Sequence, residues 1–394
     1  MSSTVISVPM SGRASTYRLT AAYFVAFVFL GLTTGLLGPT LPSLADQAQV
    51  GLSAISYVFT ARSAGYLFGS VLSGKLFDRR SGNPIMAAML FTMSVMMALV
   101  PLAPGLWLLL ITMLILGAAE SGLDVGANTL LGWAHGTGVG PFMNAMHSLF
   151  GVGALIAPLI VAQSVSFRLP ATHSYLFLAL LLMPVSLVFL RLPSPIPTVR
   201  IVTGGHAAAK PEQVFLIGLF LFLYVGAEVG FAGWIYTYAT TLRLSDANTA
   251  AYLTSLFWGA LTLGRMLTIP VVACISPESV LMSSLAGCLI SLALILASPS
   301  SLTAVFVGTF CLGVSMAPIF PTTLSLAGCR MRLTGHVTGW FIVGASAGSM
   351  LIPLLIGQAL SAIGPRFVIV ITTCALAIAF GVRFFMIRNL NDSE

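Results

Sequence analysis

The sequence predicts an all-α membrane protein with twelve transmembrane helices, arranged as two pseudo-symmetric six-helix bundles. Three observations carry this prediction: the composition, the length and spacing of the apolar segments, and an internal repeat. Of the 394 residues, 58% are hydrophobic and only 7% are charged. Soluble proteins carry about 25% charged residues, so this composition leaves too few charges to cover a water-facing surface. Most of the surface is therefore expected to face lipid.

Apolar segments long enough to cross a bilayer fall into two sets of six. A spanning helix needs roughly 20 apolar residues to cross the hydrocarbon core. The first set is expected near 17–44, 50–76, 83–102, 106–133, 141–165 and 173–192. The second set is expected near 213–242, 247–272, 279–297, 301–328, 334–361 and 365–388. Residues 193–212 between them have the proline, glycine and basic content of a linker, so the expected bundles are 1–192 and 213–394.

Lysine and arginine in the short connecting segments predict the orientation in the membrane. With the amino terminus inside, twelve of these residues fall on the inner side and only Arg168, Arg243 and Arg366 on the outer side. Basic residues favour the cytoplasmic side, so both termini are expected in the cytoplasm. The net charge of +7 is explained by these topology signals, and no nucleic-acid partner is expected.

Other function classes find no support among the residues. Five cysteines are scattered without the paired spacing of a disulfide framework or a zinc site. No nucleophile triad, acid–base set or phosphate-binding loop stands out. We therefore expect no enzyme activity, no catalytic residues, no bound metal and no cofactor other than a coupling ion.

The two sets of helices resemble each other at an offset of 195 or 196 residues. The matched segments are LGLTTG (30–35) with VGAEVG (225–230), LGAAESGLDVGANTL (116–130) with LGVSMAPIFPTTLSL (312–326), and GVGALIAPLI (151–160) with SAGSMLIPLL (346–355). Parallel repeats with a substrate site between them near the midplane are typical of secondary transporters. Residues that break the repeat call for a reason beyond the scaffold. Three carboxylates do so: Glu120 matches Met316, Asp124 matches Phe320, and Glu228 matches Thr33.

The fourth expected span carries a polar stripe formed by Glu120, Asp124 and Asn128. Their spacing of four residues keeps them on one face of a helix. A charge at the bilayer centre costs about 2.5–3.5 kcal/mol, so buried carboxylates indicate a function. We predict that Asp124, aided by Glu120, takes up the coupling ion. The alternative is a buried polar cluster that only locks helices together.

Arg62 lies near the middle of the second expected span, too deep for its side chain to reach the interface. It should pair with a carboxylate, and the fourth span offers the nearest ones. Its predicted role is to compete with the coupling ion for Asp124 or Glu120. The alternative is a static structural ion pair.

Two further spans supply candidate sugar-binding residues. On the seventh, Glu228 lies among glycines and is followed by Trp234, and an aromatic face beside a carboxylate suits a sugar. Trp234 alternatively belongs to the interfacial aromatic belt. On the fifth, Asn144 and His147 share one face, although a lone histidine can be a packing residue. The predicted substrate-binding set is Asn128, Asn144, His147, Glu228 and Trp234.

Charged residues at the inner face are candidates for a gate. The segment GKLFDRRSGN (74–83) places Asp78 beside Arg79, and Arg265 occupies a related place in the second half. Charge pairs among Asp78, Arg79 and Arg265 are predicted to brace the inner face when it is closed. The alternative is that these are only topology charges.

These segments resemble the major facilitator superfamily. The segment 74–83 resembles its signature of a glycine before an Asp-Arg pair, but departs from it after Arg80. The closer resemblance is to the fucose–galactose–gluconate symporter family, especially its sodium-dependent glucose transporter branch. It is carried by GPTLPSL (38–44), SYVFTARSAGYLFGS (56–70), GLDVGANT (122–129), PFMNAMHSLFGVGA (141–154), YVGAEVGFAGWIYTYA (224–239) and FWGALTLGR (257–265).

The resemblance implies a major facilitator fold and assigns site residues. The family's acid on helix 4 falls on Asp124 and its asparagine on Asn128, its polar pair on helix 5 falls on Asn144 and His147, and its glutamate on helix 7 falls on Glu228. The fucose branch carries an acid on its first helix, and residues 17–44 contain none. A proton route is therefore not implied, and sodium coupling stays open.

Taken together, the residues and the resemblance predict a secondary transporter that imports a monosaccharide by alternating access, coupled to protons or sodium. The expected substrate is a hexose, and the expected state is a monomer in a bacterial inner membrane. Two alternatives stay open. One is an exporter of drugs or amphipathic metabolites, and the other is a receptor of the same fold that transports nothing.

Overall fold

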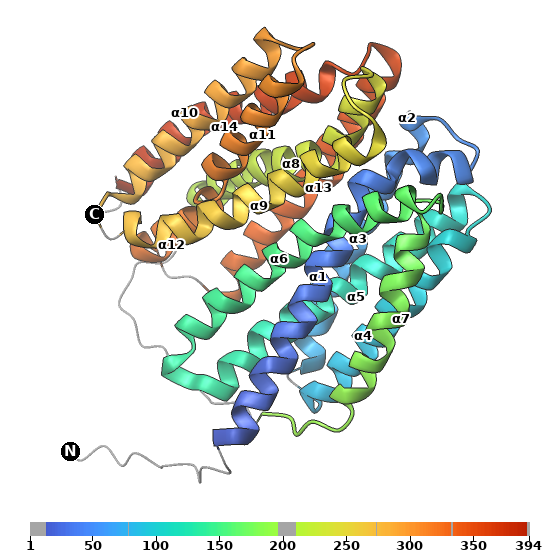
Figure 1. Ribbon diagram of the computed structural model, residues 1–394. Helices are drawn as coiled ribbons and strands as arrows, with labels where there is room; N and C mark the ends of the chain where they lie inside the picture. Colours follow the sequence, from blue (N-terminus) through green and yellow to red (C-terminus); the bar gives the residue numbers. More distant parts are fainter. Residues whose placement is uncertain (1–12, 78, 196–209, 273, 332–333, 392–394) are drawn as a thin grey trace.

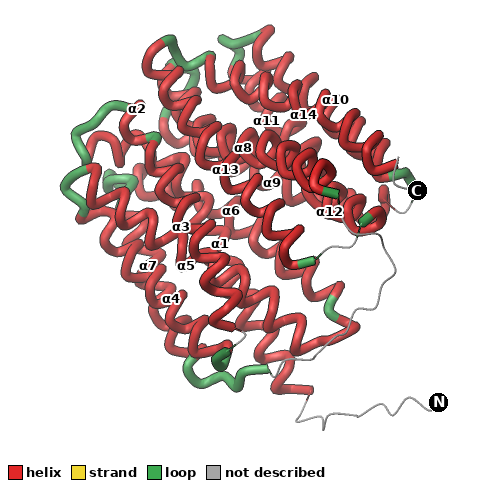
Figure 2. Tube along the Cα trace, turned by 180° about the vertical axis from the view of Figure 1, so that it is seen from behind, coloured by secondary structure: helices red, strands yellow, loops and turns green. Residues whose placement is uncertain are grey.

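The chain is helical throughout the part that a computed structural model describes, namely residues 13–77, 79–195, 210–272, 274–331 and 334–391 (Figure 2). The first half contains α1 (Arg13–Gln47), α2 (Leu52–Ile55), α3 (Tyr57–Phe77), α4 (Gly82–Leu99), α5 (Leu106–His135), α6 (Gly140–Ser166) and α7 (His173–Phe189). The second half contains α8 (Pro211–Thr241), α9 (Ala247–Val272), α10 (Pro277–Ala297), α11 (Leu302–Met316), α12 (Ile319–Arg330), α13 (Gly335–Ala362) and α14 (Phe367–Asn391).

The helices confirm the twelve expected spans. Nine helical segments of the described residues are long and apolar enough to cross a membrane, by length and composition. Two expected spans are each divided: 50–76 forms α2 and α3, and 301–328 forms α11 and α12. The second division follows from Pro318, which supplies no backbone N–H to continue the helix. The expected linker ends at residue 212, whereas α8 already begins at Pro211. Residues 196–209 of the linker lie outside the described part.

The two halves lie side by side, with α1–α7 on one side and α8–α14 on the other (Figure 1). The seam between them is formed mainly by α6 against α9 and by α3 against α13. We call the end that carries the connections 167–172 and 242–246 the distal end, and the end near both chain termini the terminal end. Because connections alternate between the ends, α3 and α5 both run from the distal end to the terminal end.

Glycines repeat between the halves at the points of closest helix packing. A Cβ added to Gly117 on α5 would lie 2.0 Å from the carbonyl oxygen of Arg62 on α3. A Cβ added to Gly313 on α11 would lie 2.7 Å from the carbonyl oxygen of Phe257 on α9. Both pairs therefore require glycine for backbone contact between helices. Their residue numbers differ by the offset that relates the two halves in sequence.

A second pair of contacts follows the same rule. A Cβ on Gly153 of α6 would lie 2.1 Å from the carbonyl oxygen of Val28 on α1, and one on Gly348 of α13 would lie 1.9 Å from that of Phe222 on α8. The packing of the helices is thus repeated in the two halves, whereas the polar side chains between them are not. Where the first half has Arg62, the second half has Phe257.

Candidate functional site

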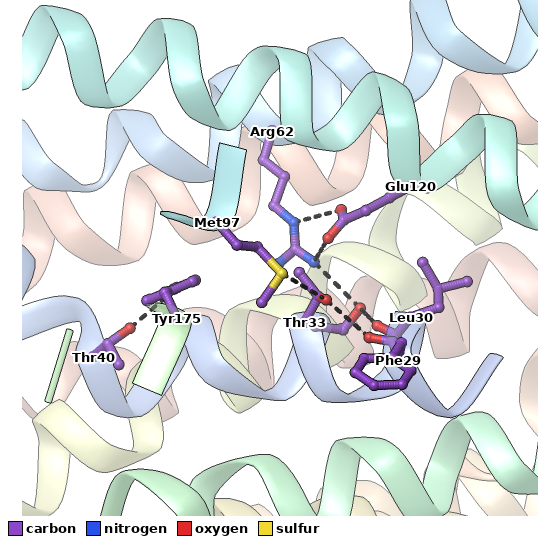
Figure 3. Close-up of polar contacts among 9 residues, drawn as sticks. Phe29, Leu30, Thr33, Thr40, Arg62, Met97, Glu120 and Tyr175 are labelled. Atoms are coloured by element: carbon purple, nitrogen blue, oxygen red, sulfur yellow. Dashed lines mark hydrogen bonds and ion pairs between the residues drawn. The ribbon is translucent and has the colours of Figure 1, made fainter. Parts of the chain in front are cut away.

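A buried ion pair joins α3 to α5 in the first half. Nε and Nη2 of Arg62 donate to the two carboxylate oxygens of Glu120 at 2.8 and 2.7 Å (Figure 3). Nη2 also donates to the hydroxyl of Thr34 on α1 at 3.3 Å. The side chains are 13% and 2% exposed for Arg62 and Glu120. This two-pronged geometry is the strong form of an arginine–carboxylate contact, and it neutralises Glu120.

Of the two carboxylates for which Arg62 was predicted to compete with the coupling ion, the structure pairs it with Glu120. Arg62 binds Glu120, while Asp124 accepts a hydrogen bond from the hydroxyl of Tyr66. Because α3 and α5 run in the same direction, partners advance together by four residues. Arg62 meets Glu120, and one turn later Tyr66 meets Asp124. The residue pattern left the partner of Arg62 open between Glu120 and Asp124, and the geometry gives it Glu120.

Tyr66 is a site residue that sequence reasoning missed. The signal was available, because Tyr66 follows Arg62 by four residues just as Asp124 follows Glu120. A tyrosine in an apolar helix is expected to be a packing residue unless a polar partner on a neighbouring helix is known. Here its hydroxyl binds a half-buried carboxylate, so Tyr66 belongs to the polar site.

The stripe on α5 continues as a chain of hydrogen bonds to α6. Nδ2 of Asn128 donates to Oδ1 of Asp124 at 2.8 Å, and Oδ1 of Asn128 lies 3.2 Å from Nε2 of His147. Because the amide oxygen of Asn128 can only accept, His147 must carry its proton on Nε2. The ring of His147 also meets Phe27 edge-on, with centroids 5.2 Å apart. Tyr66, Asp124, Asn128 and His147 thus form one connected polar chain across three helices.

His147 and Asn144 are exposed side chains at the seam, whereas Asp124 and Asn128 are half-buried behind them. Within the described residues, the side chain of Asn144 forms no hydrogen bond. The polar chain therefore runs from the buried surroundings of Asp124 to a pair of exposed groups. Those exposed donors and acceptors are free to bind a solute.

The second half contributes Glu228 and Arg265 across the seam. Glu228 is half-buried on α8, one turn after Tyr224, with which it interacts. The hydroxyl of Tyr224 donates to the carbonyl oxygen of Met316 at 3.0 Å. Arg265 on α9 is also half-buried and lies within electrostatic reach of both Tyr224 and His147. It was predicted as a gate residue, and the structure places it beside the predicted binding residues.

Trp234 lies apart from the other predicted binding residues. It is fully buried toward the distal end of α8, and its Nε1 donates to the carbonyl oxygen of Pro353 at 2.9 Å. Its ring packs against Phe59 of the first half, with centroids 5.8 Å apart. The indole N–H and the aromatic ring of Trp234 therefore both make contacts within the protein. Trp234 thus lies in a buried, distal part of the seam, and its role in sugar binding stays a prediction.

Contacts between the halves gather toward the distal end. Nε2 of Gln358 on α13 donates to the carbonyl oxygen of Ser53 at 2.8 Å and to the hydroxyl of Ser56 at 3.3 Å. Other bonds between the halves in the described residues run from mid-bundle toward the same end: Ser349 to Ser63, Thr60 to Met350, and Asn248 to Ser166. The distal end is therefore closed, and the exposed His147 and Asn144 lie on the terminal side of this closure.

Replacing Gln358 with alanine is expected to loosen the distal closure, since two hydrogen bonds between the halves are lost. Each bond contributes about 0.5–1.5 kcal/mol. Loss of both bonds should therefore raise the population with an open distal end by about fivefold or more. A cysteine replacing the fully buried Val58, which takes part in neither bond, reports this opening through its rate of maleimide labelling in a background without native cysteines. Gln163→Ala, an exposed glutamine on α6, serves as the control. Equal labelling rates in the two variants would contradict the role of Gln358.

The remaining predicted gate residues stay untested. Asp78 lies outside the described residues. Arg79 is exposed at the terminal end, just after α3, and its backbone N–H donates to the carbonyl oxygen of Leu76 at 3.2 Å.

Comparison with known proteins decides the family. The model of the Major Facilitator Superfamily matches residues 23–353, which is most of the chain. The chain belongs to the Major Facilitator Superfamily. Among solved structures, this superfamily member resembles a bacterial homologue of the human lysosomal transporter Spinster in its inward-facing and occupied conformation. The TM-score is 0.80 at 12% identity, over 96% of this chain and 98% of the other. At that identity, the likeness speaks for the fold alone.

Curated relatives within the superfamily confirm the resemblance predicted from the helical segments. Sodium-dependent glucose transporter 1 of Xenopus laevis is 32% identical over 375 residues, covering 87% of this chain and 76% of the relative. The Danio rerio protein of the same name is 28% identical over 433 residues, covering 99% and 73%. The protein is thus a multi-pass membrane transporter and not an enzyme.

Proposed function

We propose that the protein imports a monosaccharide by alternating access, driven by a cation that binds at Asp124. The observation that carries the proposal is that two carboxylates on one helix have different partners. Glu120 is neutralised by a two-pronged bond from Arg62. Among the described residues, the hydrogen-bond partners of the Asp124 carboxylate are neutral, namely the hydroxyl of Tyr66 and the amide of Asn128. A half-buried carboxylate without a fixed cation is suited to bind an exchangeable one.

Sodium is the proposed cation. Carboxylate, hydroxyl and amide oxygens are hard ligands, which suit cations such as Na⁺. The relatives named sodium-dependent glucose transporter 1 support the same choice. Binding of Na⁺ at Asp124 would compete with the hydrogen bond from Asn128. That competition links the ion to His147, because Asn128 is the connecting residue of the polar chain.

The proposed sugar site lies at the seam, where both halves present polar groups. Asn128, Asn144 and His147 face it from the first half, and Glu228 and Arg265 from the second. Hydroxyl groups of a hexose both donate and accept hydrogen bonds, so amides, an imidazole and a carboxylate form a matching set. Contributions from both halves would let the sugar follow the relative motion of the halves.

The charge distribution in the loops supports a terminal end that faces the cytoplasm. The proposed location is the inner membrane of a bacterial cell. With that orientation, the closed distal end is the outer one, and the structure is inward-facing. We propose a monomer as the functional unit, because the two halves of one chain together supply the residues of the proposed ion and sugar sites.

Uptake into proteoliposomes tests this function. The purified protein is reconstituted, and accumulation of labelled D-glucose and a panel of other hexoses is followed under an imposed Na⁺ gradient, an imposed pH gradient, or neither. We expect accumulation above the external concentration only with the Na⁺ gradient. Accumulation driven by the pH gradient alone would replace sodium by protons. Absence of gradient-driven uptake for every sugar would reject the proposed function.

A further inference from the structure

A separate pocket, with apolar walls and two charged residues, lies at the terminal end of the second half, remote from the seam residues. It is formed between the beginning of α8 and the end of α14, two helices that pack side by side. Its volume is about 510 Å³, a size that suits a small ligand or a lipid headgroup. Its lining consists of Glu212, Phe215, Leu216, Phe385, Arg388 and Asn389. We call it the α8–α14 pocket.

The α8–α14 pocket presents one carboxylate and one guanidinium group. Glu212 and Arg388 are both exposed, and in the described residues neither takes part in an ion pair. Nδ2 of Asn389 donates to Oε2 of Glu212 at 3.4 Å, which ties the acid to the wall of the pocket. The two charges cancel, so the pocket matches a ligand that itself carries one positive and one negative group.

The other walls are apolar and open to the surroundings. Phe215 is 67% exposed and Phe385 is 60% exposed. They lie one helical turn inside the charged residues, Phe215 after Glu212 and Phe385 before Arg388. Charged groups at the helix ends with exposed aromatic rings one turn deeper reproduce the order of headgroup and acyl chain in a bilayer.

We propose that the α8–α14 pocket binds a phospholipid with a phosphate and a primary amine in its headgroup, as in phosphatidylethanolamine. The guanidinium of Arg388 suits the phosphate, and the carboxylate of Glu212 suits the ammonium group. A choline headgroup has no N–H to donate to Glu212. An anionic glycerol headgroup would leave Glu212 facing a second negative charge. The pocket thus selects the ethanolamine headgroup over both.

Native mass spectrometry of the delipidated full-length protein tests this proposal. The protein is incubated with equal amounts of phosphatidylethanolamine, phosphatidylcholine and phosphatidylglycerol that share the same acyl chains. The wild type is expected to retain phosphatidylethanolamine preferentially. Arg388→Ala should lower that retention about tenfold, since a hydrogen bond to a charged group is lost. Glu212→Ala should shift the preference toward phosphatidylglycerol, because its repulsion of an anionic headgroup is removed.

Matched controls separate the pocket from the general lipid surface. Arg366→Ala removes the same charge at the opposite end of α14, and Phe384→Ala removes an exposed ring beside Phe385 that does not line the pocket. Both controls should retain phosphatidylethanolamine as the wild type does, whereas Phe385→Ala should lose it. Equal retention of the three lipids by the wild type would overturn the proposal. Unchanged retention in Arg388→Ala, or equal losses in Arg388→Ala and Arg366→Ala, would also overturn it.

Discussion

Replacing Asp124 with asparagine is expected to abolish sodium-driven accumulation while leaving sugar exchange in place. Asparagine keeps the side-chain size, and its one oxygen can still accept the hydrogen bond from Tyr66. The bond from Asn128 to Oδ1 of Asp124 is lost, but Asn128 keeps its bond to the backbone carbonyl oxygen of residue 124. Coupling between two ligands is typically worth about 1–3 kcal/mol, so the acceleration of uptake by Na⁺ should fall by about 5–150-fold. The measurement is labelled-sugar uptake into proteoliposomes with and without a Na⁺ gradient, together with counterflow at equal Na⁺ on both sides.

The matched control for this prediction is Asp246→Asn at the distal surface. Hydrogen bonds from the hydroxyl and the backbone N–H of Thr249 lower the pKa of Asp246, so the control also removes an ionised carboxylate. Asparagine caps a helix as well as aspartate does, which preserves the start of α9. Sodium-driven accumulation should be unchanged in this variant. If Asp124→Asn retained wild-type Na⁺ dependence, Asp124 would not be the coupling site.

Replacing Arg62 with glutamine is expected to destabilise the fold severely. Glu120 would lose both bonds from the guanidinium while staying 2% exposed. Removing one partner of a buried ion pair typically costs about 3–5 kcal/mol, because the other charge is left without compensation. The fraction of protein that stays monodisperse in detergent after graded heating measures this loss.

The double variant Arg62→Gln with Glu120→Gln distinguishes a lost charge balance from a lost shape. Two neutral amides can hydrogen-bond to each other, so most of the stability should return in the double variant. The coupling between neighbouring sites in such a cycle is typically about 0.5–3 kcal/mol. If the stability lost in the double variant equalled the sum of the losses in the two single variants, Arg62 and Glu120 would not act as a pair. Retained Na⁺ coupling in the double variant would place the ion at Asp124 alone.

Much of the helical frame could be read from the chain, because lipid imposes a simple rule of length and hydrophobicity. The span expected at 247–272 is α9 with the same bounds, and the span expected at 106–133 is α5 within two residues. The repeat offset predicted which glycines take equivalent places, as Gly117 and Gly313 do. The divided spans were not foreseen, since an apolar stretch with one proline still satisfies the rule of length.

The candidate site was predicted only in part. Asp124, Asn128 and His147 were singled out, and the structure joins them in one hydrogen-bonded chain. Tyr66 was missed, and the expected role of Trp234 in sugar binding stays a prediction, since its ring is buried against Phe59 toward the distal end. A single helix shows which residues share a face, but not which neighbouring helix that face meets.

The sequence by itself determined the number of spans, the two-part frame and the polar stripe on α5, because each depends on spacing along one helix. Only the tertiary structure decided which partner each carboxylate of that stripe has. The parallel run of α3 and α5 sets Arg62 against Glu120 and leaves Tyr66 to Asp124. Register between helices depends on close backbone contact, as at Gly117, and that contact is a property of two segments that are far apart in the chain.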